Sequence, residues 1–350
     1  MRLSPRPLAM AAVGLLAVTV TACGGSSAED GESLTVVMWG GSAQSAHVDS
    51  YVAPWAEENG VEVLQDQPTD YAKLRAQVES GKVSWGVVEA EPNFTVTACE
   101  DGLLEKIDTS VVDTSALDPQ FVNDCAIPNL QYAFTISYNT DVFPDAHPTT
   151  WAEFFDTEEF PGKRGFWRYA TGGIFEAALL ADGVAAEDLY PLDIDRAFAK
   201  LDTIKDDIVF YDTGDQQVQL LASGEAPLVQ AWNGRVFDAV KQGQPVANEF
   251  GEHLLSYDQI AIPKGYPNAD LAMEWMGHFV EDLEGQAADA DATAYSPVNP
   301  AALDLVADDV LPQLPTAPEN DDSRAIVIDY TYWAENYDAV SERFNEWLAK

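Results

Sequence analysis

Short apolar runs alternate with helical stretches in the first third of the chain. Residues 34–38, 61–64 and 83–88 are largely apolar and rich in β-branched side chains, which is typical of buried strands. One helical stretch between them runs to Glu58, and another follows Asp70, which can cap its N-terminus. This β-α-β-α-β order predicts a parallel sheet with right-handed crossover connections.

The rest of the chain continues this mixture without an internal repeat. Further strands are predicted at residues 132–138, 208–211, 227–231 and 259–263, and further helices after the capping box at 150–153, at 175–180, at 195–201 and along the C-terminus. We interpret the strands at 208–211 and 227–231 as a second sheet. Two α/β units result, joined by strand-like segments near residues 132–138 and 255–262. Such paired crossovers predict a ligand cleft that closes by hinge motion.

The N-terminus has the pattern of a secretion signal. Two arginines precede an apolar run at residues 8–20, which is too short to span a bilayer. Small residues then lead to Cys23 in a pattern that resembles a lipobox. We predict a lipoprotein signal peptide over residues 1–22, lipidation of Cys23 and a flexible tether over 23–33. An ordinary cleaved signal with a chance cysteine is the alternative.

The compartment follows from this signal. The mature protein is expected outside the cytoplasm, held by lipid on the outer face of the cell membrane, and facing the periplasm where the cell has an outer membrane. Apart from Cys23, the chain has two cysteines, Cys99 and Cys125. Two cysteines in an oxidising compartment usually form a disulfide. A pair of buried thiols is the alternative.

The charge balance excludes some partners. Asp and Glu number 59 against 18 Lys and Arg, which gives a formal net charge of −41. Nucleic acids and anionic membrane surfaces both need a basic partner, so neither is predicted to bind. An acidic surface more often serves solubility, although it is compatible with a cationic ligand. No stretch after the signal is long and apolar enough for a membrane span, so the lipid anchor is the only predicted link to the membrane.

Catalytic motifs are missing from the sequence. It contains no nucleophile elbow, phosphate-binding loop, dinucleotide-binding fingerprint or zinc-protease motif, and its four histidines lack ligand spacing. We therefore predict no enzyme activity, no cofactor and no metal. A secreted hydrolase with two catalytic carboxylates among the 59 acids is a remote alternative, and a surface adhesion or scaffold protein is another.

Aromatic and acidic residues gather where predicted strands begin or end. Ligands of open α/β sheets lie outside the carboxyl ends of the strands, and rings with carboxylates suit an organic ammonium group. The candidate ligand-binding residues are Trp39, Glu89, Glu91, Trp232, Asn233, Tyr257, Asp258 and Tyr295. Gly40, Gly41 and Ser42 would let backbone amides approach the same ligand and would instead favour a ligand carboxylate. The alternative for each aromatic residue is that it packs in the core or between the lobes and does not contact a ligand.

Four motifs resemble the solute-binding lipoproteins of ABC importers, in the spermidine/putrescine-binding group. They are VMWGGS at residues 37–42, TWAEFFD running into FPGKRG at 150–165, AWNGR at 231–235 and IAIPKG at 260–265. The resemblance covers about residues 33–350 and implies the two-lobed type II periplasmic binding protein fold, which is α/β. Lobe 1 would comprise residues 34–136 plus about 258–305, and lobe 2 residues 137–257 plus about 306–350.

The resemblance also implies the function. A monomeric substrate-binding protein would capture a polyamine-like solute, such as putrescine or spermidine, and deliver it to permease subunits. Binding would shift an open–closed equilibrium without covalent chemistry. The positions of Trp39, Trp232, Asp258 and Tyr295 match residues that line the cleft in this group.

Three departures from the polyamine pattern point to another ligand. Gly41 stands where polyamine binders carry an acid, residues 170–173 contain none of the usual acids, and Ser256 replaces an aromatic residue. Glu89 or Glu91 would have to replace a missing acid. An opine, an amino acid or another small cationic or zwitterionic solute is therefore the alternative ligand for the same transport role.

Overall fold

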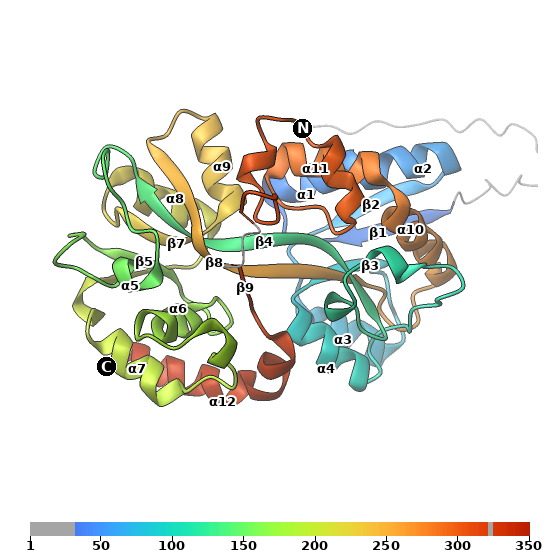
Figure 1. Ribbon diagram of the computed structural model, residues 1–350. Helices are drawn as coiled ribbons and strands as arrows, with labels where there is room; N and C mark the ends of the chain where they lie inside the picture. The colour runs from blue at the N-terminus through green and yellow to red at the C-terminus, as the bar shows by residue number, and fades with distance from the viewer. Residues whose placement is uncertain (1–31, 321–324) are drawn as a thin grey trace, which may run out of the picture. The chain divides into compact units, whose positions relative to one another are not determined.

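The computed structural model describes residues 32–320 and 325–350, and within them nine strands form one sheet (Figure 1). The strand order is β2-β1-β3-β8-β4-β7-β5-β6, and β9 pairs with β8. Two long antiparallel strands, β4 (Ala126–Asn139) and β8 (Val246–Ala261), run through its middle. The prediction of a second sheet is wrong, because β4 and β8 hydrogen-bond to strands from both parts of the chain.

One end of the sheet has the predicted parallel order. β1 (Ser33–Val37) lies between β2 (Glu62–Asp66) and β3 (Val87–Ala90), and β3 pairs with the end of β8. The accompanying helices are α1 (Gly41–His47), η1 (Val48–Val52), α2 (Ala53–Asn59), α3 (Tyr71–Ser80), α4 (Pro92–Glu100), α10 (Ala269–Glu281) and α11 (Leu283–Thr293). Asp70 caps α3 by accepting a hydrogen bond from the Lys73 N–H, as predicted. β3 begins four residues later than expected, so Glu89 lies inside the strand.

The other end holds the second group of parallel strands. β5 (Arg164–Trp167) lies between β6 (Ile208–Tyr211) and β7 (Leu228–Trp232), and β7 pairs antiparallel with β4. Its helices are α5 (Trp151–Phe154), α6 (Ile174–Ala181), α7 (Ile194–Asp202), α8 (Gly214–Ser223), α9 (Asn233–Lys241) and α12 (Tyr330–Leu348). Short pieces complete the chain: η2 (Thr114–Ala116), η3 (Pro119–Phe121), η4 (Ala186–Asp188), η5 (Lys205–Asp207), η6 (Pro300–Leu305), η7 (Leu311–Gln313) and β9 (Ile326–Val327). The predicted helices at 175–180, 195–201 and the C-terminus are confirmed.

Separate apolar clusters stabilise the two ends. Val36, Trp275 and Phe279 belong to the cluster around β1, whereas Phe175 and Trp333 belong to the one around β5. Burial of such side chains stabilises each end by roughly 1.5–3 kcal/mol per large side chain. Two cores under one sheet fit a two-lobed architecture, and the lobe boundaries given above stay a prediction.

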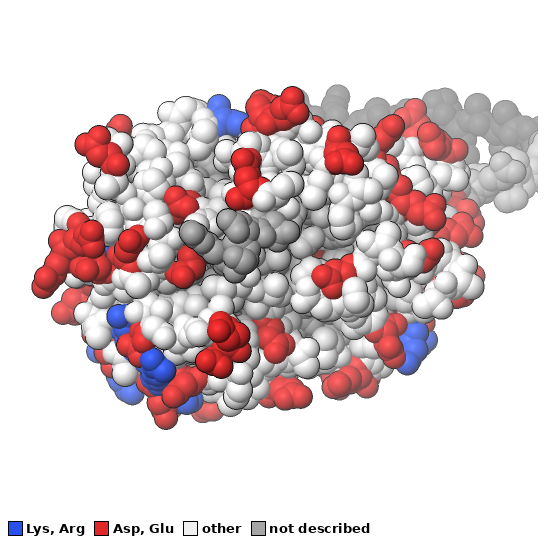
Figure 2. Space-filling model, viewed as in Figure 1, with Lys and Arg blue, Asp and Glu red and all other residues white. Residues whose placement is uncertain are grey.

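The surface of the described residues is rich in acids. Figure 2 shows Asp and Glu side chains spread over the visible face, with few Lys or Arg among them. Among the described residues, no helix combines the length and apolar character that crossing a membrane would need. The predicted signal peptide, Cys23 and most of the tether lie outside the described residues.

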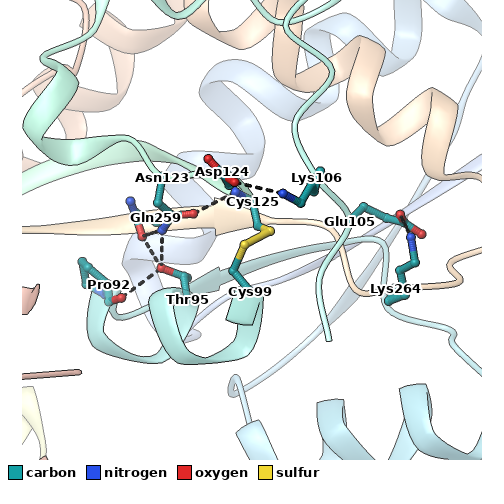
Figure 3. The surroundings of a disulfide bond; sticks show 10 residues. All are labelled: Pro92, Thr95, Cys99, Glu105, Lys106, Asn123, Asp124, Cys125, Gln259 and Lys264. Atoms are coloured by element: carbon teal, nitrogen blue, oxygen red, sulfur yellow. Dashed lines mark hydrogen bonds and ion pairs between the residues drawn. A yellow bond between two sulfur atoms is a disulfide. The ribbon is translucent and has the colours of Figure 1, made fainter. Parts of the chain in front are cut away.

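A disulfide joins Cys99, at the end of α4, to Cys125, just before β4, which confirms the predicted pairing (Figure 3). Their Cα atoms are 5.7 Å apart. Nearer the start of α4, the Thr95 hydroxyl donates to the Gln259 side chain of β8. Helix α4 is therefore fixed to both long strands, and the residue at its N-terminal cap is Glu91.

Removing the disulfide should destabilise the fold. Replacing both Cys99 and Cys125 by Ser frees a loop with a sequence separation of 26, which by chain entropy lowers the free energy of unfolding by about 3–4 kcal/mol. Urea unfolding of a chain without residues 1–23 measures this loss. A change below about 1 kcal/mol would show that the bond adds little to stability.

Candidate ligand-binding site

A cavity of about 570 Å³ lies where strands from both ends of the sheet finish. Trp39 follows β1, Glu91 follows β3, and Trp167 and Trp232 are the last residues of β5 and β7. This placement agrees with the rule that open α/β sheets bind ligands outside the carboxyl ends of their strands. Its lining is Trp39, Ala43, Gln44, His47, Pro68, Tyr71, Glu89, Glu91, Leu130, Tyr132, Trp167, Tyr169, Asp212, Thr213, Gly214, Trp232, Arg235, Asp258 and Tyr295.

Six predicted site residues meet in this cavity. They are Trp39, Glu89, Glu91, Trp232, Asp258 and Tyr295. The indole of Trp39 is 39% exposed, which leaves much of its face open on the cavity wall. Besides Trp39, six Tyr and Trp rings from separate segments of the chain line the cavity, so its wall is largely aromatic. They are Tyr71, Tyr132, Trp167, Tyr169, Trp232 and Tyr295. Such rings pack against alkyl chains and attract cations.

Asp258 is a buried carboxylate near the C-terminal end of β8. Its Oδ2 accepts a hydrogen bond of 2.8 Å from the Nε1–H of Trp39. Burial raises the pKa of Asp258 well above its ordinary value, and the charges of Glu89 and Glu91 raise it further. A positive group in the cavity would favour its ionised form.

Glu89 is buried beside an imidazole. Its Oε1 accepts a hydrogen bond of 2.6 Å from the Asn129 side chain and lies 3.9 Å from Nε2 of His47. Nδ1 of His47 lies 2.6 Å from Oδ1 of Asp289. Burial lowers the pKa of His47, but Asp289 and Glu89 outweigh it, so the pKa is raised. His47 therefore supplies Glu89 with part of a counter-charge.

Glu91 is the N-cap residue of α4, and its side chain contacts residues on both sides of the cavity. It accepts hydrogen bonds from the Tyr71 hydroxyl at 3.3 Å and the Thr171 hydroxyl at 3.4 Å. Burial raises the pKa of Glu91 to about 7, against the opposing effect of these hydrogen bonds. In the described residues, no ion pair joins Glu89, Glu91 or Asp258 to a lysine or arginine, so the three acids can together hold an ammonium group.

Arg235 adds a positive charge to the cavity that contains the three acids. It stands in the third position of α9 and, among the described residues, is the only lysine or arginine in the lining. Throughout the parts of the chain that the structure describes, Arg235 has neither an ion pair nor a side-chain hydrogen bond. A guanidinium without a carboxylate partner suits the bidentate binding of a ligand carboxylate.

Sequence reasoning missed Arg235 as a site residue. It quoted Arg235 within the AWNGR motif but gave it no role. The signal was available, since an arginine directly after a cleft motif is notable in a chain with only 18 basic residues. His47, Tyr71 and Tyr132 carry no such signal, because helical or strand periodicity alone makes them core residues.

Five predicted site residues do not line this cavity. The Gly41 N–H donates to Gln67, and the Ser42 hydroxyl donates to Asp238 at 3.3 Å. Gly40 precedes them at the start of α1. Asn233 is fully buried, where its oxygen accepts from the Ala133 N–H. Tyr257 is also buried, and its ring packs against Phe121 and Tyr330. Among the described residues, no three His, Cys, Asp or Glu side chains converge as a metal site requires.

Sequence comparisons identify related proteins. The family model of the bacterial extracellular solute-binding proteins matches residues 50–319. A γ-aminobutyric acid (GABA)-binding protein of Pseudomonas aeruginosa is 35% identical over 326 residues, which cover 91% of this chain and 92% of that protein. The spermidine/putrescine-binding periplasmic protein 1 of Haemophilus influenzae is 27% identical over 246 residues, 66% of this chain and 67% of that protein.

Structure comparisons agree with the predicted fold. The structure of the Atu4243–GABA receptor has a TM-score of 0.85 and 42% identity, covering 91% of this chain and 98% of that one. The binding protein AgtB of A. tumefaciens R10, in complex with agropinic acid, has a TM-score of 0.79 and 35% identity, covering 91% and 99%. The α/β periplasmic binding protein fold is therefore confirmed. The predicted resemblance to solute-binding proteins is also confirmed, whereas the polyamine group is a distant relative.

The buried carboxyl of Glu91 should make stability depend on pH. Its pKa is about 7 in the folded state against 4.5 as its ordinary value, so the folded state holds the proton more tightly. The resulting stabilisation is complete below pH 4.5 and is lost as the pH rises through about 7. Glu91→Gln mimics the protonated form. The free energy of unfolding of the variant should therefore gain about 2 kcal/mol relative to wild type between pH 5 and pH 8.

Urea unfolding at several pH values tests this prediction. Glu176→Gln is a matched positive control, because burial in the core likewise raises the pKa of Glu176 to about 7. A difference between Glu91→Gln and wild type that stays constant from pH 5 to pH 8 would contradict the assignment to Glu91.

Proposed function

The chain belongs to the bacterial extracellular solute-binding proteins, and we propose that it captures a short ω-amino acid such as GABA for an ABC importer. The ligand ammonium would lie among Glu89, Glu91 and Asp258, and the ligand carboxylate would pair with Arg235. The observation that carries this proposal is the combination of three buried acids and one unpaired guanidinium in a single cavity. A zwitterion with separated charges satisfies both groups at once.

The same observation disfavours a polyamine. The second ammonium of a polyamine would lie beside Arg235 and be repelled, because both groups are positively charged. The carboxylate of GABA in the same place would be attracted. The missing acids at Gly41 and residues 170–173 point the same way. The identity values add support, since the two GABA-related proteins are 35% and 42% identical and the polyamine-binding one is 27% identical.

An opine is the second candidate ligand. The cavity volume of about 570 Å³ leaves room for a molecule larger than a four-carbon amino acid. Opines are amino-acid conjugates and also carry ammonium or amine groups with carboxylates. The AgtB protein, whose structure contains agropinic acid, is 35% identical over most of this chain. A bound opine would contact the same charged residues as GABA and would pack against more of the aromatic rings.

Capture would proceed through closure of two lobes. The strands β4 and β8 connect both ends of the sheet, and the predicted lobe boundaries near residues 136 and 258 fall on them. Glu91 and Thr171 come from opposite sides of this predicted boundary, and the Thr171 hydroxyl donates a hydrogen bond to Glu91. Ligand binding would stabilise the closed state, which the permease then recognises. Lipidation of Cys23 would hold the protein at the outer face of the membrane.

GABA should bind, and both charged anchors should be needed. Isothermal titration calorimetry is expected to detect GABA binding to wild type, with affinity at least tenfold lower for Arg235→Gln and for Asp258→Asn. The reason is that a hydrogen bond to a charged group contributes roughly 1.5–3 kcal/mol. Arg196→Gln is the matched control, because Arg196 pairs with Asp182 on the surface, away from the cavity. Its affinity should stay within about twofold of wild type.

Putrescine should bind far less well than GABA. It also has four carbons, but it ends in a methylene-linked ammonium group where GABA ends in a carboxylate. A thermal-shift series with GABA, putrescine, spermidine and opines compares the ligands directly, since a ligand at 100 times its Kd stabilises by about 2.7 kcal/mol. A larger shift with putrescine than with GABA would overturn the zwitterion assignment. An opine giving the largest shift would favour the second candidate.

A further inference from the structure

We propose that Gly214 is a positioning residue, whose missing side chain leaves the space that lets Arg235 point its guanidinium into the ligand cavity. The inference rests on the proposed function, in which Arg235 binds the ligand carboxylate. It assigns specificity for a carboxylate-bearing ligand to a residue that has no side chain of its own.

The stem of Arg235 passes directly over Gly214. A Cβ atom placed on Gly214 would lie 2.8 Å from Nε, 3.0 Å from Cδ and 3.1 Å from Cγ of Arg235. Carbon atoms in contact are ordinarily about 3.5–4.0 Å apart. Any residue other than glycine at position 214 would therefore displace the middle of the Arg235 side chain.

The backbone itself does not require glycine at position 214. Gly214 is the first residue of α8, and its φ lies outside the left-handed region. The cap is supplied by Thr213, whose hydroxyl accepts a hydrogen bond from the Gln216 N–H. Alanine is a better helix former than glycine, so an alanine here should not weaken α8. Gly41, which also lies near the guanidinium, differs because its φ of 70° does favour glycine.

Arg235 has two places that its guanidinium could occupy. Of the residues that the structure describes, it alone lines both the ligand cavity and an outer groove, which is a separate hollow of about 510 Å³ between parts of α8 and α9. Asp215 and Asp238 line that groove and would attract a guanidinium. In this structure neither forms an ion pair with Arg235. Packing against Gly214, rather than a salt bridge, thus fixes the direction of Arg235.

A double-mutant cycle tests the proposal. Wild type, Gly214→Ala, Arg235→Gln and the double variant are titrated with GABA and with 4-aminobutanamide, which keeps the ammonium but lacks the carboxylate. Gly214→Ala should weaken GABA binding at least fivefold and change binding of the amide less than twofold. In the Arg235→Gln background, Gly214→Ala should change GABA affinity less than twofold, because the two substitutions remove the same interaction.

The controls separate positioning from folding. Ser223→Ala, at the exposed far end of α8, should leave GABA affinity within twofold, and the thermal midpoint of Gly214→Ala should stay within about 2 °C of wild type. Gly214→Ser brings the same Cβ atom and repeats the test if the alanine variant folds poorly.

Two results would overturn the role of Gly214 alone. One is unchanged GABA affinity in Gly214→Ala while Arg235→Gln binds weakly. The other is an undiminished loss from Gly214→Ala in the Arg235→Gln background. If Arg235→Gln itself bound GABA as wild type does, the carboxylate anchor of the proposed function would fail, and this inference with it.

Discussion

The antiparallel pairing of β4 with β8 is the constraint on which the remaining structure depends. The two strands pair from Ala126 and Ala261 at one end to Asn139 and Val246 at the other. β3 joins β8 near the first end, and β7 joins β4 toward the second. Two groups of parallel strands are thereby held with their carboxyl ends facing one cavity. The same pairing buries Asp258, so the scaffold strand also carries a charged site residue.

Burying acids in one cavity has an energetic consequence for the empty protein. Removing a carboxylate from water is unfavourable, and neighbouring acids add repulsion. Protonation relieves this cost, which is why the pKa values of Glu89, Glu91 and Asp258 are raised. An entering ammonium offers the same relief through Coulomb attraction. In the proposed complex, the buried acids would therefore favour a cationic group, and Arg235 would keep that group at one end of the ligand.

Helix α4 links the stability of the fold to the geometry of this cavity. Its last turn carries Cys99, its first turn carries Thr95, and its N-terminal cap is Glu91. The disulfide and the hydrogen bond to Gln259 hold the helix against β4 and β8, next to Asp258. Small displacements of α4 would move Glu91 relative to Asp258 and so change the electrostatics of the cavity. The disulfide is thus connected to the site through α4, although both its cysteines lie outside the cavity lining.

The sequence alone determined much of this protein: the first three strands and their helices, the disulfide pairing, the solute-binding family and six of the cavity residues. Local periodicity and strand-end chemistry are sufficient for these features, because each depends on neighbouring residues or on a recognisable motif. Only the tertiary structure joined the two groups of strands into one sheet and placed Arg235 in the same cavity as the acids. The pairing of Trp39 with Asp258 spans 219 positions, and the packing of Arg235 on Gly214 joins two separate helices. Such contacts depend on burial and space between distant segments, which no local pattern records.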